Sequence, residues 1–168
     1  MFRQIAPLFL GLSLFSAGIC ANPATVAESL DARIVEQKPG GKVLLRAAYR
    51  ARPGDVVEYQ ATYTNTGSKS VQGVVATLPV PVGSEYVLAS AQPREVLASL
   101  DGKSFAPVPL RRATPKLDGG QQLLPVQVAD YRYLRWYIEM LAPGESAVVT
   151  ARMQVVAEPE NIVALLSE

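Results

Sequence analysis

The sequence predicts an all-β fold, a β-sandwich or barrel of about seven to nine short strands. Segments in which apolar and polar residues alternate recur along the chain, while no stretch after the N-terminal leader keeps a helical apolar period for three turns. Thirteen prolines and twelve glycines separate these segments. Charged residues occupy only 18% of the 168 positions, below the roughly 25% of ordinary globular proteins.

The first 21 residues have the form of a secretory signal peptide. Arg3 supplies the positive charge, an apolar run covers residues 5–19, and small residues precede Ala21. This run is shorter than the ~20 residues that cross a membrane as a helix. We expect cleavage after Ala21 and no membrane span in the remaining chain. Acylation of Cys20, as in a lipoprotein, and retention of the leader as an anchor are the alternatives.

The remaining chain, residues 22–168, is electrically neutral. Loss of Arg3 would leave 15 basic side chains, equal to the 15 acidic ones, and neither cysteine nor histidine would be present. A neutral chain without a basic run gives no electrostatic reason to bind nucleic acid. The lack of histidine removes His-based catalysis and most transition-metal sites. We expect a disulfide-free monomer without a cofactor.

Strands are expected from the N-terminus of this chain onward. Residues 22–42 form an N-terminal segment in which residues 30–35 could add an edge strand. The main domain is expected over residues 43–156. Its first strand, residues 43–50, should direct one alternating set of side chains into the core. That set is Val43, Leu45, Ala47 and Tyr49.

The clearest strand follows the turn Arg52-Pro53-Gly54-Asp55. Its inward set is Val57, Tyr59, Ala61 and Tyr63. It ends at the turn cluster Asn65-Thr66-Gly67-Ser68. Further strands are expected over residues 71–78, 86–91 and 95–100, and Asp101-Gly102 predicts a hairpin.

Residues 107–130 hold four prolines and Gly119-Gly120, so we expect a long, irregular and mobile connection with one short strand. The next strand is expected over residues 133–140. Their inward set is Leu134, Trp136, Ile138 and Met140. The last strand has the inward set Ala147, Val149, Ala151, Met153 and Val155. Residues 157–168 form a C-terminal tail, either a trailing strand or a short helix.

The strand over residues 133–140 supplies the candidate interaction surface. If Trp136 points into the core, then Tyr133, Arg135 and Tyr137 point outward, about 6.5 to 7 Å apart along one face. Tyr and Arg are enriched in recognition surfaces. The alternative is that a neighbouring strand or the proline-rich connection covers these side chains.

Catalytic and metal-binding patterns are weak in this sequence. Glu139 and Glu145 lie across a predicted turn, which is a poor arrangement for a pair of catalytic carboxylates. Asp55 suits a turn position. Asp55 alone, or Asp118 with Asp130, falls short of the 6 to 8 oxygen ligands that calcium takes. We expect no metal and no enzymatic activity.

Three groups of motifs match one known pattern in order and spacing. Residues 52–67 give a Pro-Gly-Asp turn and a Tyr-bearing strand ending Asn-Thr-Gly, and residues 74–87 give Leu-Pro, then Gly, then Tyr-Val. Asp101-Gly102, Trp136 and the turn at residues 141–146 extend the match. The chain thereby resembles the bacterial DUF11 repeat over most of residues 43–156.

The resemblance implies an immunoglobulin-like β-sandwich in bacterial cell-envelope or surface proteins, a family without assigned chemistry. Two departures matter. Ala76 and Thr77 stand where many members carry Asp before the Leu-Pro segment, so an ion site at that corner is not expected. Only one copy is present, so the chain would not build the stalk that tandem copies form.

We therefore expect a non-catalytic exported domain with a structural or protein-interaction role, in the periplasm or at the cell surface of a bacterium. Its partner would be another envelope protein or a surface glycan. The alternative function is a carbohydrate-binding module that uses the exposed Tyr133, Arg135 and Tyr137. An enzyme is the third class, and it would require a turnover that depends on one carboxylate.

Overall fold

The computed structural model describes residues 25–117 and 119–156. The expected signal peptide at residues 1–21 and the expected strand or helix in the tail at residues 157–168 lie outside the described residues. The described residues form eleven strands and one short 3-10 turn, η1 (Val128–Asp130). The all-β prediction is confirmed, with more strands than the seven to nine expected.

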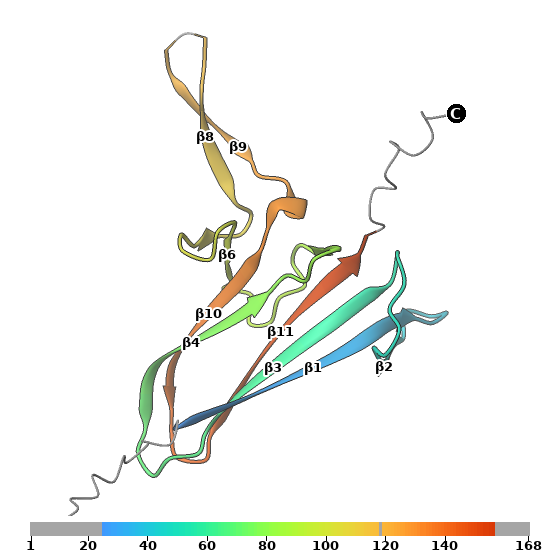
Figure 1. Cartoon of the computed structure of the whole chain (residues 1–168), viewed down its shortest axis with the longest axis vertical. Helices are drawn as coiled ribbons and strands as arrows, with labels where there is room; N and C mark the ends of the chain where they lie inside the picture. Colours follow the sequence, from blue (N-terminus) through green and yellow to red (C-terminus); the bar gives the residue numbers. More distant parts are fainter. Residues whose placement is uncertain (1–24, 118, 157–168) are drawn as a thin grey trace, which may run out of the picture.

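The strands are arranged in two stacked antiparallel sheets and a separate hairpin (Figure 1). The larger sheet has the order β2-β1-β3-β11-β5, which are Val43–Ala47, Val26–Gln37, Val56–Asn65, Ser146–Val155 and Ser84–Tyr86. The smaller sheet has the order β4-β10-β6-β7, which are Val71–Pro79, Tyr133–Leu141, Leu97–Ser99 and Ala106–Pro107. The hairpin consists of β8 (Arg111–Pro115) and β9 (Gln121–Pro125).

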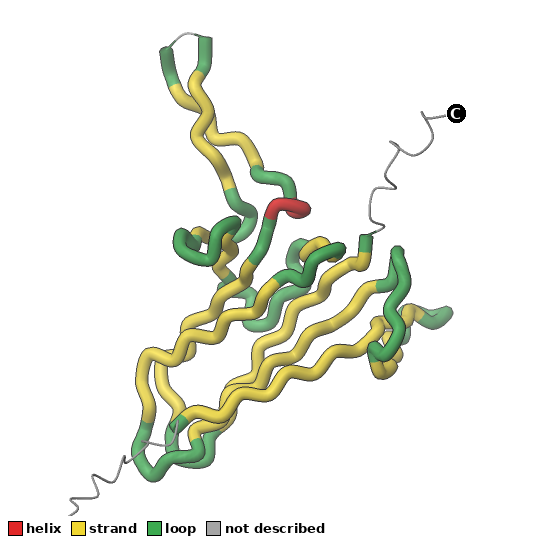
Figure 2. Tube along the Cα trace, viewed as in Figure 1, coloured by secondary structure: helices red, strands yellow, loops and turns green. Residues whose placement is uncertain are grey.

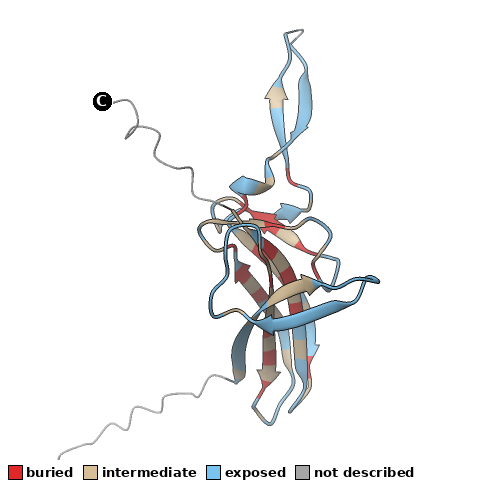
Figure 3. Cartoon of the chain, turned by 90° about the vertical axis from the view of Figure 1, so that its right-hand side faces the viewer, coloured by how far each residue is buried: buried red, intermediate tan, exposed pale blue. Residues whose placement is uncertain are grey.

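The core lies between the two sheets, where burial is concentrated (Figure 3). Alternation along β3 and β11 places inward side chains opposite one another, as in the pairs Val57 with Met153 and Ala61 with Val149. The smaller sheet covers them with buried residues of β4 and β10. These are Ala76, Leu78, Leu134 and Trp136. The inward faces expected for β3 and β11 are therefore confirmed.

Trp136 is buried as predicted, with 2% of its surface exposed. Its indole Nε1 donates a hydrogen bond of 2.8 Å to the carbonyl oxygen of Pro93. A buried Trp N–H needs such an acceptor. Trp136 therefore fixes the segment that follows β5 against the smaller sheet.

Asn65 explains why β3 ends where it does. Its side chain is fully buried and donates to the carbonyl oxygens of Lys69 at 2.8 Å and Leu141 at 2.9 Å. Its Oδ1 accepts a bond of 2.9 Å from the Gly67 amide. An Asx-type turn of this kind stops a strand and satisfies backbone groups that leave the ladder. The Asn-Thr-Gly turn thus joins β3 to the end of β10.

The inward orientation expected for Val43, Leu45, Ala47 and Tyr49 is wrong. All five residues of β2 are exposed, and Tyr49, just past the strand, is 92% exposed. The core and the partly buried residues packed on it include Val26 at the start of β1 but no residue of β2. Even Leu30, which pairs with the buried Ala61, is 56% exposed. Alternation gives the face of a strand, but not whether anything packs on it.

The inward position expected for Met140 is also wrong, since this residue is 50% exposed and Leu141 is buried instead. The alternation changes phase at Gly73 on β4, which has a φ of +65°. The ladder between β10 and β4 omits Glu139, the residue opposite this glycine.

Three shorter predictions also need correction. The strand expected over residues 86–91 is only Ser84–Tyr86, because the chain turns at Ala89, a non-glycine residue with φ of +62°. The strand expected over residues 95–100 is only Leu97–Ser99. The irregular connection expected over residues 107–130 is largely the ordered β8–β9 hairpin. Period-two alternation could not reveal that hairpin because neither of its faces is buried.

Candidate functional site

The predicted residues Tyr133, Arg135 and Tyr137 lie on the outer face of β10, opposite the buried Trp136; we call them the Tyr-Arg face. Tyr137 is 65% exposed, whereas Tyr133 and Arg135 are half-buried. The guanidinium carbon of Arg135 lies 3.5 Å from the centre of the Phe105 ring, and its Nε donates to Thr77 Oγ1 at 3.3 Å. Within the Tyr-Arg face, Tyr137 is therefore the one aromatic residue that is mostly exposed.

Tyr133 is covered by the turn between β6 and β7. A Cβ atom at Gly102 would lie 2.9 Å from Cε2 of the Tyr133 ring, so the ring packs directly on this glycine. The Asp101 carboxylate holds the turn by accepting bonds from the Ser104 amide at 2.9 Å and the Lys103 amide at 2.8 Å. These two amides and the Ser99 hydroxyl lower the pKa of Asp101. The expected hairpin at Asp101-Gly102 is thus confirmed, since these residues lie in the turn between β6 and β7. The same turn supports the Tyr133 ring.

The second candidate feature is the β8–β9 hairpin, which we call the arm. It projects away from the sandwich as an isolated pair of strands (Figure 2). Nine of its ten strand residues are exposed. Leu123, which pairs with Ala113, is 61% exposed, and Leu124, which pairs with Arg112, is exposed on the other face. The arm therefore has apolar side chains but no core of its own.

The base of the arm is anchored in the core. The Leu110 amide donates a bond of 2.7 Å to the hydroxyl of Tyr131, and the Val126 amide donates to the Leu110 carbonyl at 2.9 Å. Tyr131 is fully buried and its ring stacks on Tyr86 at a centroid distance of 6.3 Å. A cavity of about 240 Å³, whose lining includes Phe105, lies between this base and the β6–β7 turn. The arm and the Tyr-Arg face therefore meet at Phe105.

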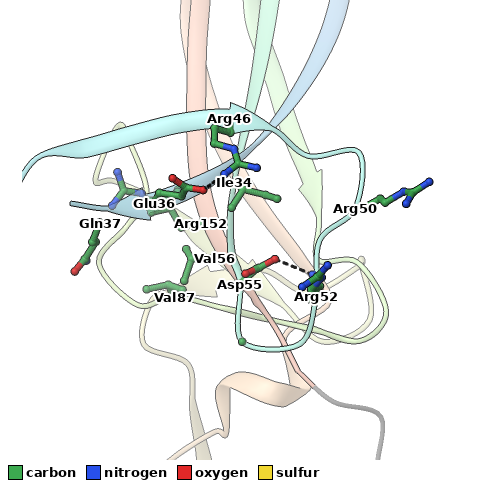
Figure 4. Close-up of a pocket in the computed structure, with 12 residues that line it drawn as sticks. Ile34, Glu36, Gln37, Arg46, Arg50, Arg52, Asp55, Val56, Val87 and Arg152 are labelled. Carbon is green, nitrogen blue, oxygen red and sulfur yellow. Dashed lines mark hydrogen bonds and ion pairs between the residues drawn. The ribbon is translucent and has the colours of Figure 1, made fainter.

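The third feature is a cavity of about 680 Å³ beside the β2–β3 connection, which sequence reasoning did not anticipate. Its lining includes four arginines, which we use to name it the arginine cavity: Arg46, Arg50, Arg52 and Arg152. Figure 4 shows Glu36 near Arg46 at one side, with Asp55 and Arg52 across from them. Arg46, Arg50 and Arg52 lie within seven residues of one another, whereas no local motif links Arg152 to these three.

Two of these arginines are neutralised. Arg46 forms an ion pair with Glu36, and Arg152 Nε donates to Glu58 at 2.9 Å. Glu36 also pairs with Lys38 at 3.0 Å, and this hydrogen bond is the main reason that the pKa of Glu36 is lowered; Arg46 lowers it further. Glu36 and Glu58 are therefore each paired with a cation, and Asp55 is the remaining acidic side chain of the lining.

The carboxylates considered for catalysis or metal binding serve turns. Glu145 accepts a bond of 2.7 Å from the Ala142 amide, and Asp55 accepts one of 2.8 Å from the Arg52 amide. Within residues 25–117 and 119–156, no group of three or more His, Cys, Asp or Glu side chains could hold a metal ion. The same residues include no helix long and apolar enough to cross a membrane.

We compared the sequence and the structure with those of known proteins. No family model, no curated protein and no solved structure matches the chain. The resemblance to the DUF11 repeat therefore stays a prediction.

Proposed function

We propose that this protein is a non-catalytic, exported domain of the bacterial cell envelope, with an immunoglobulin-like sandwich, that binds a partner protein. The observation that supports this most strongly is the arm. An isolated two-stranded hairpin is at best marginally stable in water, yet this one projects from the body with exposed Leu123 and Leu124. Apolar residues on such a projection gain stability when a partner covers them.

The composition of the arm indicates the kind of partner. Arg111, Arg112 and Lys116 supply three positive charges, against Asp118 as the one acidic residue of the sequence between Leu110 and Val126. A complementary surface would combine an apolar site for the two leucines with an acidic rim. Both edges of the hairpin can also pair with an extended strand, which is a common mode of recognition.

The Tyr-Arg face extends this surface toward the sandwich. Tyr137 lies beside Val75, its partner across the β4–β10 ladder, and both are exposed. Arg135 is held over Phe105 and therefore needs little ordering when it meets a partner. The small cavity at Phe105 would accept a single apolar side chain between the face and the arm.

A surface glycan is the second candidate partner, and the exposed ring of Tyr137 favours it. Sugars stack on flat aromatic rings that are accessible to solvent, and a row of two would bind more strongly than one. Tyr133, however, is packed against Gly102. Because the Tyr-Arg face offers a single accessible ring, a protein partner is the better proposal for this face.

The test is retention of envelope proteins by the purified domain and its variants. We expect a specific protein that is retained by the wild type and by the Val148→Gln control, whose residue is similarly exposed on the opposite sheet. The double variant Leu123→Gln/Leu124→Gln should retain at least about tenfold less. Equal retention by the arm variant would contradict the proposal. Loss only in Tyr137→Ser, together with competition by a sugar, would favour the glycan.

A further inference from the structure

The lining of the arginine cavity carries four arginines against two carboxylates, Glu36 and Asp55, which is a formal excess of two positive charges. Arg50 and Arg52 form no side-chain hydrogen bond or ion pair with any residue in the described part of the chain. Arg52 interacts with Asp55 through its backbone amide, which leaves its guanidinium group unused. Two guanidinium groups of the lining residues thus have no internal partner.

The loop that bears Arg52 is firmly positioned. The Asp55 amide donates to the Arg52 carbonyl at 2.9 Å, and the Gly54 amide donates to the Val155 carbonyl at 2.8 Å, which ties the turn to the end of β11. Gly54 has a φ of +92°, and no atom lies within 4 Å of the place where its side chain would begin. The turn is therefore held at the end of β11, and there is open space beside Gly54, which lines the cavity.

Arg50 lies at the open end of the cavity. Figure 4 shows its side chain extending away from the other labelled residues. An exposed arginine has several rotatable bonds, so this guanidinium can turn toward a ligand that is already held by Arg52. Closure of Arg50 would then complete a two-arginine clamp.

The rest of the lining suits a ligand with a compact and partly apolar body. Ile34, Val56 and Val87 contribute apolar surface, and the volume of about 680 Å³ lies in the range of small-molecule sites. Gln37 adds a neutral polar group at the rim. An anionic head and a ring-sized body could therefore be accommodated together.

We propose that the arginine cavity binds a phosphate monoester, with the phosphate held between Arg50 and Arg52 and its organic body on the apolar part of the lining. Charge decides between oxyanions. A phosphate monoester carries about −1.5 to −2 at neutral pH, which matches the formal excess of two positive charges in the lining, whereas a carboxylate carries only −1. Planar guanidinium groups also bind phosphate oxygens in a bidentate manner.

This site is independent of the arm. The arm is the separate β8–β9 hairpin, and none of its residues lines the arginine cavity. The phosphate could belong to a free small molecule or to a lipid headgroup, since both offer the same chemistry. Phenyl phosphate is a suitable free probe. Vesicles of phosphatidylcholine with and without phosphatidic acid, whose headgroup is a phosphate monoester, test the lipid source.

The experiment is calorimetric titration of the purified domain at low salt with phenyl phosphate, inorganic phosphate and benzoate. We expect saturable binding of phenyl phosphate and at least about tenfold weaker binding of benzoate, which has the same ring and one charge. The double variant Arg50→Gln/Arg52→Gln should weaken phenyl phosphate binding at least about tenfold. Both residues are exposed, so its melting temperature should equal that of the wild type.

The matched control is Arg111→Gln/Arg112→Gln, which removes the same charge from the arm. It should bind phenyl phosphate like the wild type. Equal weakening in both double variants would mean that net charge alone attracts the anion, and this would overturn the proposal. Absence of saturable binding by either phenyl phosphate or phosphatidic acid vesicles would overturn it as well. Binding of the vesicles alone would assign the site to a lipid headgroup.

Discussion

The backbone amide of Leu110 donates a hydrogen bond of 2.7 Å to the phenolic oxygen of Tyr131. These two residues stand on either side of the arm, so this bond closes its base. Tyr131 has no exposed surface, and Leu110 is buried as well. The arm thus has exposed strands on a fixed base, which suits an element that presents side chains to a partner in a defined direction.

The first prediction concerns this bond. Tyr131→Phe keeps the ring but leaves the buried Leu110 amide without its acceptor, which should lower the free energy of unfolding by about 1 to 3 kcal/mol. Chemical denaturation measures this loss. The control is Tyr137→Phe, which removes a solvent-exposed hydroxyl and should change stability by less than about 0.5 kcal/mol. Equal effects of the two changes would show that the bond contributes nothing.

The second prediction concerns Trp136. Trp136→Ala should lower the free energy of unfolding by about 3 to 5 kcal/mol, since it empties a central core position and removes the bond to Pro93. Trp136 is the one tryptophan of the chain, so native fluorescence reports it directly. We expect iodide to quench it weakly in the native state and strongly after unfolding. Strong quenching of the native protein would place the indole in solvent.

The sequence predicts the centre of the fold better than its margins. β3 and β11 lie in the middle of the larger sheet with one face covered, so their alternation correctly identifies Val57, Ala61 and Val149 as core. The same pattern in β2 misleads because the smaller sheet does not reach that far. Alternation shows which side chains of a strand share a face. Whether that face is buried depends on strands that are distant in the sequence.

The candidate surfaces show the same division. The outward direction of Tyr137 follows from the burial of Trp136 on the same strand, so the alternation within β10 is enough to predict it. The packing of Tyr133 on Gly102 and the meeting of Arg152 with Arg52 depend on long-range contacts, which no local pattern encodes. The arm was missed because a strand without a buried face leaves no period-two signal.

The third prediction separates the two tyrosines of the Tyr-Arg face. Tyr133→Ser should lower the free energy of unfolding by about 1 to 2 kcal/mol, because its half-buried ring covers the β6–β7 turn. Tyr137→Ser should change it by less than about 0.5 kcal/mol. Thermal unfolding of both variants measures the difference. Equal losses would mean that Tyr137 is also packed, and the face would then be part of the structure only.

The fourth prediction concerns alkaline pH. Burial, and next the hydrogen bond from the Tyr63 hydroxyl to Glu28 at 2.9 Å, raise the pKa of Tyr63 from 10 to about 12. A folded pKa above the unfolded one favours the protonated native form, so this contribution is complete below pH 10 and is lost as pH rises toward about 12. The free energy of unfolding should fall across this window.

The control for the pH prediction is Tyr63→Phe, which cannot ionise. Its stability should fall less steeply between pH 10 and about 12 than that of the wild type. Some slope should persist, because burial also raises the pKa of Tyr59 and Tyr86. Identical slopes in the two proteins would show that Tyr63 ionises with an ordinary pKa.

The most direct test of the proposed function is photocross-linking in the intact cell envelope. A benzophenone amino acid replaces Leu123 on the arm in one variant and Val148 on the outer face of the larger sheet in the other; both positions are exposed. If the arm binds a partner protein, irradiation gives one discrete adduct of higher mass from position 123 and none from position 148. No adduct at position 123, or the same adducts from both positions, would contradict the account.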